Sequence, residues 1–135
     1  MNFFTHDAIK RIRRDYYSAI YFHRTKELLL AEKNFTPVTI QVFQRNNDGV
    51  LCGVEEVVAL LKQATGYWLG LKWVNCAKTL EVHTLADGDI LRAGEPVMHI
   101  TGPYAYIAHL ESVYLGILSR RTLVATNVRR AVNAA

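Results

Sequence analysis

The C-terminal third of the chain carries the longest helical pattern of apolar positions. Apolar residues recur there at offsets of three, four and seven, so they share one face of a helix: Tyr104, Ile107, Ala108, Tyr114, Leu115 and Leu118. Gly102 is a candidate N-cap, and Pro103 would occupy the first turn, where a missing N–H costs nothing. The pattern predicts a long helix that begins near residue 103.

Helical spacing also marks the N-terminal region. Asp7 is a candidate N-cap for a short helix. Its inner face would carry Ile9, Ile12 and Tyr16. A second helix is expected over residues 15–33, with Ile20 and Leu28–Leu30 on its apolar side. A third, over residues 54–64, has acidic residues in its first turn and Gly66 just past its end.

Between the helices the period changes to two, which is typical of strands. Residues 38–43 alternate, and the turn residues 46–49 predict a hairpin with a short return strand at 50–52. Further on, two turns separate three short strands within residues 80–101, which predicts an antiparallel meander. The aromatic segment 67–74 is either core packing between helix and sheet or part of an interface. One α+β domain, with helices packed on an antiparallel sheet, accounts for the whole pattern.

Composition narrows the class of protein. Half of the 135 residues are hydrophobic and 21% are charged, as in ordinary globular domains, and no apolar run reaches the length of a membrane span. With no signal peptide, a cytoplasmic location is expected. The formal net charge of +4 favours anionic partners. Nucleic acid is not expected, because the short basic run 11–14 lacks an interleaved stacking platform.

No metal site is expected within the chain. Cys52 and Cys76 are far apart in sequence and have no paired ligand motif around them. The five histidines are scattered. His83 and His99 fall in two predicted strands and would face each other across a hairpin, which favours a surface pair over a metal site.

Glu111 interrupts the apolar face of the C-terminal helix. A carboxylate in that position requires a partner, because an isolated desolvated charge costs several kcal/mol. Two interpretations remain: a structural ion pair, or a site wall in which Glu111 orients one of the arginines that follow. Those arginines are Arg120, Arg121, Arg129 and Arg130, with Ser119 and Thr126 beside them. They form either a solvated helix face or a binding site for carboxylate and phosphate groups.

Three motifs in order resemble the nicotinate phosphoribosyltransferases, and more distantly the quinolinate phosphoribosyltransferases that share their fold. The first is Tyr21-Phe22-His23-Arg24-Thr25, the second is the segment 87–97 leading to Gly102, and the third runs from Leu110-Glu111 to Thr126-Asn127. The resemblance implies an open-faced sandwich as residues 1–118. Residues 119–135 would then begin the segment that leads to a catalytic α/β barrel.

These enzymes transfer ribose 5-phosphate from phosphoribosyl pyrophosphate to the ring nitrogen of a pyridine acid, in NAD biosynthesis. The resemblance implies Mg²⁺ and ATP, with binding residues outside this chain. It also implies a homodimer in which the N-terminal domain covers the partner's active site and Tyr21 stacks on nicotinate. Arg120, Arg121 and Thr126 become candidate substrate-binding residues, and Glu111 an orienting one. Catalytic residues are not identified.

Ser112 separates the two branches of this family. In the quinolinate enzymes an arginine follows the glutamate matched by Glu111 and holds the second carboxylate of the substrate. Ser112 stands at that position, so nicotinate is the expected substrate, with quinolinate- or nicotinamide-specific relatives as alternatives.

The helical pattern runs to Ala135 without a stop signal, and the family's barrel motifs are absent. We therefore expect an incomplete enzyme that is inactive by itself and self-associates through its helical exit. The alternative is a stand-alone interaction or regulatory domain derived from the same fold.

Overall fold

The computed structural model describes all 135 residues. Four α-helices are present: α1 (His6–Arg13), α2 (Ile20–Ala31), α3 (Val54–Ala64) and α4 (Glu111–Ala134). The strands are β1 (Pro37–Phe43), β2 (Gly49–Val50), β3 (Gly66–Leu69), β4 (Lys72–Asn75), β5 (Glu81–Thr84), β6 (Ile90–Leu91) and β7 (Pro96–Pro103). Three 3₁₀ turns complete the list: η1 (Ala77–Thr79), η2 (Tyr104–Tyr106) and η3 (Ala108–Leu110).

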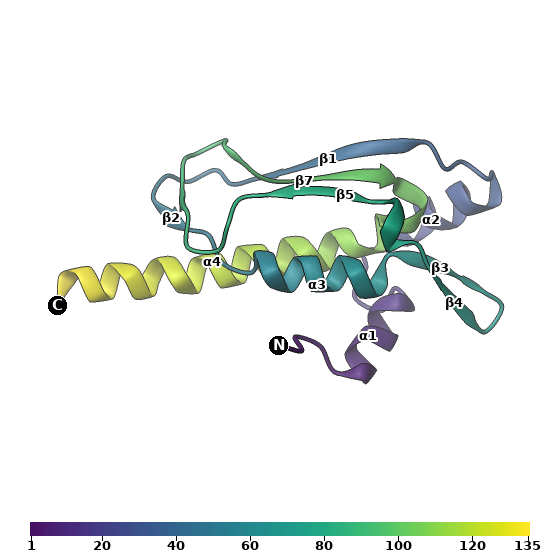
Figure 1. Cartoon of the computed structure of the whole chain (residues 1–135), viewed down its shortest axis with the longest axis horizontal. Helices are drawn as coiled ribbons and strands as arrows, with labels where there is room; N and C mark the ends of the chain where they lie inside the picture. Colours follow the sequence, from purple (N-terminus) through teal and green to yellow (C-terminus); the bar gives the residue numbers. More distant parts are fainter.

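A three-stranded antiparallel sheet in the order β1-β7-β5 forms one layer, and α3 and α4 lie beneath it (Figure 1). Met98 and Ile100 of β7 point into the core, where they join Val57 and Leu60 of α3. The other face of the sheet is polar; for example, the Thr39 and Thr101 hydroxyls are hydrogen-bonded at 2.9 Å. The expected open-faced α+β sandwich is therefore confirmed.

The predicted pairing of the short strands is wrong in two places. β1 does not form a hairpin with β2; it pairs with β7, and the register shifts between Val42 and Phe43 at the end of that pairing. β2 pairs instead with β6, so the expected meander is broken and β5 pairs directly with β7. His83 does lie opposite His99 in that register, as expected. Alternation shows that a segment is a strand but not which distant strand it joins.

The C-terminal helix begins eight residues later than predicted. Gly102 and Pro103 end strand β7, and two 3₁₀ turns intervene before α4 starts at Glu111. Gly102 serves close packing and is not an N-cap, because a Cβ at this position would lie 2.5 Å from Leu80 Cδ2. The expected domain boundary after Leu118 falls inside α4 and stays a prediction.

The N-terminal helices also differ from expectation at their ends. Thr5, not Asp7, caps α1, and its hydroxyl accepts a hydrogen bond from the Ala8 N–H at 3.1 Å. Tyr16 lies beyond the end of α1 and is exposed. Asp15 has φ 61°, so the chain turns there and α2 starts only at Ile20.

The third helix is confirmed at Val54–Ala64. The aromatic segment after it forms the β3–β4 hairpin, in which Trp68 lies opposite Trp73. The Trp68 indole N–H donates to the Arg13 carbonyl at 2.6 Å, and the Arg13 guanidinium lies 5.3 Å from the Trp73 ring centre. The hairpin is thereby attached to α1, and its end projects from the body (Figure 1). None of the helices is both long and apolar enough to span a membrane.

Candidate functional site

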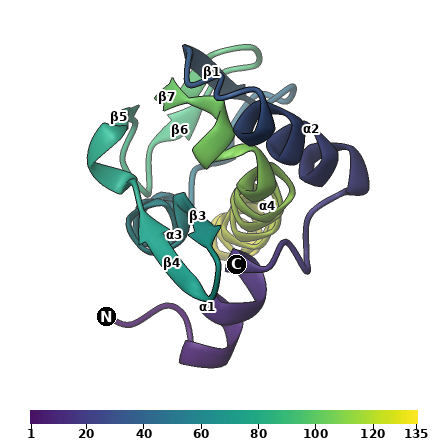
Figure 2. The ribbon, with the colours of Figure 1, turned by 90° about the vertical axis from the view of Figure 1, so that its right-hand side faces the viewer.

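Tyr21, the residue predicted to reach a substrate, lies on the outer surface of α2. Its side chain is 62% exposed, and its ring packs against Phe22 with 4.2 Å between ring centres. α2 packs on the 3₁₀ turns η2 and η3 that precede α4 (Figure 2). Tyr21 is therefore held by a regular helix and open to a ligand or a second protein surface.

Glu111, the predicted orienting residue, lies beside a tyrosine pair. The Tyr104 hydroxyl donates to Glu111 Oε2 at 3.1 Å. Burial, the Glu111 charge and the proximity of Tyr21 raise the pKa of Tyr104 above its ordinary value. Burial and Glu111 also raise the pKa of Tyr114, whose buried hydroxyl has no partner. Glu111 makes no ion pair, so neither the structural ion pair nor the arginine-orienting interpretation has support in this structure; its partner is the Tyr104 hydroxyl.

Ser112 connects this cluster to the start of α2. The backbone N–H of Ala19, the residue before α2, donates to Ser112 Oγ at 3.2 Å. Tyr21 follows two residues later, so the first turn of α4 fixes where α2 begins. Structure and sequence thus bring Tyr21, Tyr104, Glu111 and Ser112 to one place.

A buried lysine anchors α2 from its inner side. Lys26 is 5% exposed, and its ammonium lies 2.9 Å from His109 Nδ1, 3.9 Å from Asp15 Oδ1 and 5.4 Å from the Trp73 ring centre. Burial outweighs the attraction of Asp15 and lowers the pKa of Lys26 to about 8.

His109 completes this anchor as a neutral ring. Its Nε2 lies 2.9 Å from the Ala64 carbonyl, which requires the proton on that nitrogen and leaves Nδ1 to accept from Lys26. Burial and the nearby Lys26 charge lower the pKa of His109 to about 3. Sequence reasoning missed this pair, because neither residue belongs to a recognisable ligand or catalytic spacing.

The candidate substrate-binding residues of α4 point in different directions. Arg121 forms an ion pair with Glu56 of α3, with 2.8 Å between Nε and Oε2. Thr126 accepts a hydrogen bond from the Val50 N–H at 2.9 Å and donates to the Thr122 carbonyl. Arg120 is exposed and has no partner. The structure thus gives Arg121 and Thr126 roles within the fold and does not bring them to Tyr21.

The fold and the positions of the motifs agree with a comparison of the chain with known protein families. The family model for the N-terminal domain of quinolinate phosphoribosyl transferase matches residues 19–122. The chain belongs to this family. The match includes Tyr21, Glu111 and Arg121, whereas Thr126 lies beyond it.

Two relatives illustrate how this quinolinate phosphoribosyl transferase N-terminal domain compares with longer proteins. Nicotinate phosphoribosyltransferase 1 from Arabidopsis thaliana is 32% identical over 60 residues, which is 44% of this chain and 11% of the plant protein. The crystal structure of nicotinate-nucleotide pyrophosphorylase from Pyrococcus furiosus matches with a TM-score of 0.65 and 29% identity. That match covers 87% of this chain and 28% of the archaeal chain. The chain therefore spans well under a third of each relative.

The described residues do not suit a resident metal ion. No group of three or more His, Cys, Asp or Glu side chains comes together anywhere in the chain.

Proposed function

We propose that this chain is the N-terminal domain of a phosphoribosyltransferase that acts on nicotinate. In that reaction the pyridine nitrogen bonds to C1 of the ribose, the bond from C1 to pyrophosphate breaks, and pyrophosphate leaves. Membership of the quinolinate phosphoribosyl transferase N-terminal family supports the reaction class. Similarity to the plant nicotinate phosphoribosyltransferase supports the choice of nicotinate.

The choice of nicotinate over quinolinate rests on Ser112. Its neutral hydroxyl accepts from the Ala19 N–H, and the charged group next to it is the Glu111 carboxylate. A second substrate carboxylate would meet the neutral hydroxyl of Ser112 at this position instead of a guanidinium. Leaving a buried carboxylate without its partner costs about 3–5 kcal/mol, which is a factor of about 10² to 10³ or more in affinity.

Tyr21 is proposed to stack on the nicotinate ring in a partner subunit of a homodimer, as the resemblance implies. Its outward position on α2 suits a contact across subunits better than one within this domain. Mg²⁺ and ATP belong to the proposal as reaction partners held outside these residues. Among the residues predicted to bind substrate phosphate or carboxylate, Arg120 has the side chain without a partner here and is the first candidate.

The test uses the product of the gene read to its natural stop codon, assayed with Mg²⁺, ATP and phosphoribosyl pyrophosphate. We expect turnover with nicotinate and not with quinolinate. Tyr21→Ala should reduce kcat/KM for nicotinate by about 5- to 150-fold, because base–aromatic stacking contributes roughly 1–3 kcal/mol. Ser112→Arg should improve quinolinate relative to nicotinate, with Ser112→Ala as the matched control for loss of the contact to Ala19.

Two results would oppose the proposal. Equal turnover of nicotinate and quinolinate by the unmodified protein would show that Ser112 does not set the substrate. Inactivity with every pyridine acid would favour a binding or regulatory domain of the same fold.

A further inference from the structure

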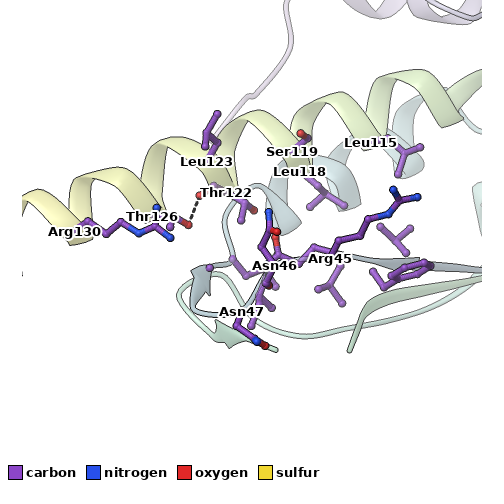
Figure 3. Close-up of a pocket in the computed structure, with 17 residues that line it drawn as sticks. Arg45, Asn46, Asn47, Leu115, Leu118, Ser119, Thr122, Leu123, Thr126 and Arg130 are labelled. Atoms are coloured by element: carbon purple, nitrogen blue, oxygen red, sulfur yellow. Dashed lines mark hydrogen bonds between the residues drawn. The ribbon is translucent and has the colours of Figure 1, made fainter. Parts of the chain in front are cut away.

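A cavity of about 450 Å³ opens between α4 and the loop that joins β1 to β2 (Figure 3). Its apolar lining includes core side chains from several elements, namely Val42, Leu51, Leu91, Val97 and Leu118. Pockets for small molecules typically measure about 300–1,000 Å³. Tyr21, Tyr104 and Glu111 do not line this cavity, so it is separate from the cluster around Tyr21, although Thr126 is part of its wall.

The cavity arises from the strand pairing that the sequence did not predict. The register of β1 shifts at Val42/Phe43, and the chain then leaves the three-stranded sheet. β2 and β6 pair with each other as a second small sheet. The space over α4 between these two sheets is not filled by side chains, and the exposed apolar side chains that line it are Phe43, Leu115 and Leu123.

Hydrogen bonds hold the walls of the cavity in place. The Ala93 N–H donates to Asn47 Oδ1 at 2.8 Å, and the Gly94 N–H donates to the Gln44 carbonyl at 2.7 Å. On the opposite wall, Thr126 fixes α4 to β2 through the Val50 N–H. The cavity is therefore preformed, which lowers the entropic cost of binding a ligand.

The charged groups of the cavity are all of one sign. Arg45 and Arg130 line it, and none of its lining residues is Asp or Glu. Arg45 reaches along the cavity toward Leu115, whereas Arg130 lies at the other end beside Thr126 (Figure 3). Neither guanidinium takes part in an ion pair, in contrast to Arg121, which is paired with Glu56.

We propose that this cavity binds a small amphiphilic anion. Its carboxylate or phosphate would be held at one end of the cavity, by Arg45 or by Arg130, while its apolar body covers the exposed side chains of Phe43, Leu115 and Leu123. A guanidinium binds either group through paired N–H donors, and covering the apolar lining adds the hydrophobic contribution. The inference goes beyond the transferase reaction and does not depend on it.

The test measures binding of three probes to the 135-residue chain by isothermal titration calorimetry. Decanoate combines a carboxylate with an aliphatic body, phenyl phosphate combines a phosphate with an aromatic body, and inorganic phosphate has no apolar body. We expect the first, the second or both to bind, and inorganic phosphate to bind at least about 10-fold more weakly. Of Arg45→Gln and Arg130→Gln, the variant that removes the guanidinium holding the head group should weaken binding about 10-fold, since it removes charge-assisted hydrogen bonds; if neither variant weakens binding, the proposal is wrong.

Matched variants distinguish binding of the anion in this cavity from nonspecific attraction of anions to the positively charged surface. Arg129→Gln removes the neighbouring charge on α4 but leaves the cavity lining intact, so binding should be unchanged. Ser119→Trp should block binding by filling the cavity, while circular dichroism confirms that the domain stays folded.

Three further outcomes would overturn the proposal. The first is that neither decanoate nor phenyl phosphate binds, whether or not an acidic peptide binds in their place. The second is that Arg129→Gln weakens binding as much as the more damaging of Arg45→Gln and Arg130→Gln. The third is that decanol, the uncharged analogue, binds as tightly as decanoate. Transferase assays play no part in these measurements, so failure here leaves the proposed function untouched.

Discussion

Helices α2 and α3 pack on the same body but bury opposite kinds of residue. α3 buries the apolar side chains of its inner face, including Val57 and Leu60, which are both fully buried. The buried residue of α2 is Lys26, while Ile20 and Leu28 are each 60% exposed. One helix is placed by the hydrophobic effect, and the other is placed by a buried polar contact.

The difference in buried residues indicates which helix stabilises the fold and which exposes an apolar surface. A helix that directs its apolar residues outward exposes a surface suited to protein association. On α2 this surface carries Ile20, Tyr21 and Leu28, and Tyr16 and Tyr17 in the segment before α2 are also exposed. α3 therefore serves the fold, and the outer side of α2 is the surface that the proposed homodimer contact of Tyr21 would use.

Truncating a leucine on each helix should give the largest contrast in stability. Leu60→Ala is expected to lower the free energy of unfolding by about 2–5 kcal/mol, because it leaves a cavity in a packed core. Leu28→Ala should change it by less than about 0.5 kcal/mol, since the side chain is largely exposed. Urea denaturation followed by circular dichroism measures both. Similar losses for the two variants would show that α2 is also held by its apolar residues.

The buried anchor of α2 should make stability depend on pH in acid. The pKa of His109 is about 3 in the folded protein, whereas a free histidine titrates near about 6.5. Between these values the unfolded chain binds more protons, so the free energy of unfolding falls as the pH falls, by up to about 1.4 kcal/mol per unit. His109→Gln should flatten this slope, and His83→Gln, at an exposed histidine, should not.

Lys26 should make the free energy of unfolding depend on pH in a second range, at alkaline pH. Its pKa is about 8 when folded and about 10.4 in an unfolded chain. The unfolded state again binds more protons between these values, so stability should rise with pH across that interval. Lys26→Met should abolish the rise while keeping most of the packing. An unchanged pH profile in both variants would mean that the pair does not hold α2.

Several elements could be predicted from the sequence because local signals decide them. α3 has acidic residues in its first turn and Gly66 after its end, and its predicted bounds are confirmed. The partner of β1 could not be predicted, because β7 lies more than 50 residues away and alternation carries no pairing information. The start of α4 was misplaced because Gly102 and Pro103 resemble a helix start but are held in a strand against Leu80.

The candidate site was predictable only in part. Motif resemblance identified Tyr21 and Glu111, and the structure joins them through Tyr104. Arg121 was expected near a substrate, but its Glu56 partner lies 65 residues away in the sequence and could not be foreseen. The Lys26–His109 contact was missed for a related reason: a helix that buries its lysine contradicts the usual reading of an amphipathic pattern.

The smallest effect on stability, and the sharpest test of the comparison, is expected from polar substitutions on the outer side of α2. Ile20→Ser with Leu28→Ser should leave the free energy of unfolding within about 0.5 kcal/mol, because both side chains are exposed. The same change should weaken self-association in sedimentation velocity experiments, since it removes apolar surface from the proposed contact. Val128→Ser with Val132→Ser is the matched control, because these valines are also exposed but lie in the C-terminal half of α4. If the α4 variant dissociates the protein and the α2 variant does not, association runs through the helical exit, as the sequence alone suggested. The outward residues of α2 would then need another explanation, and the contrast between α2 and α3 would no longer mark a partner surface.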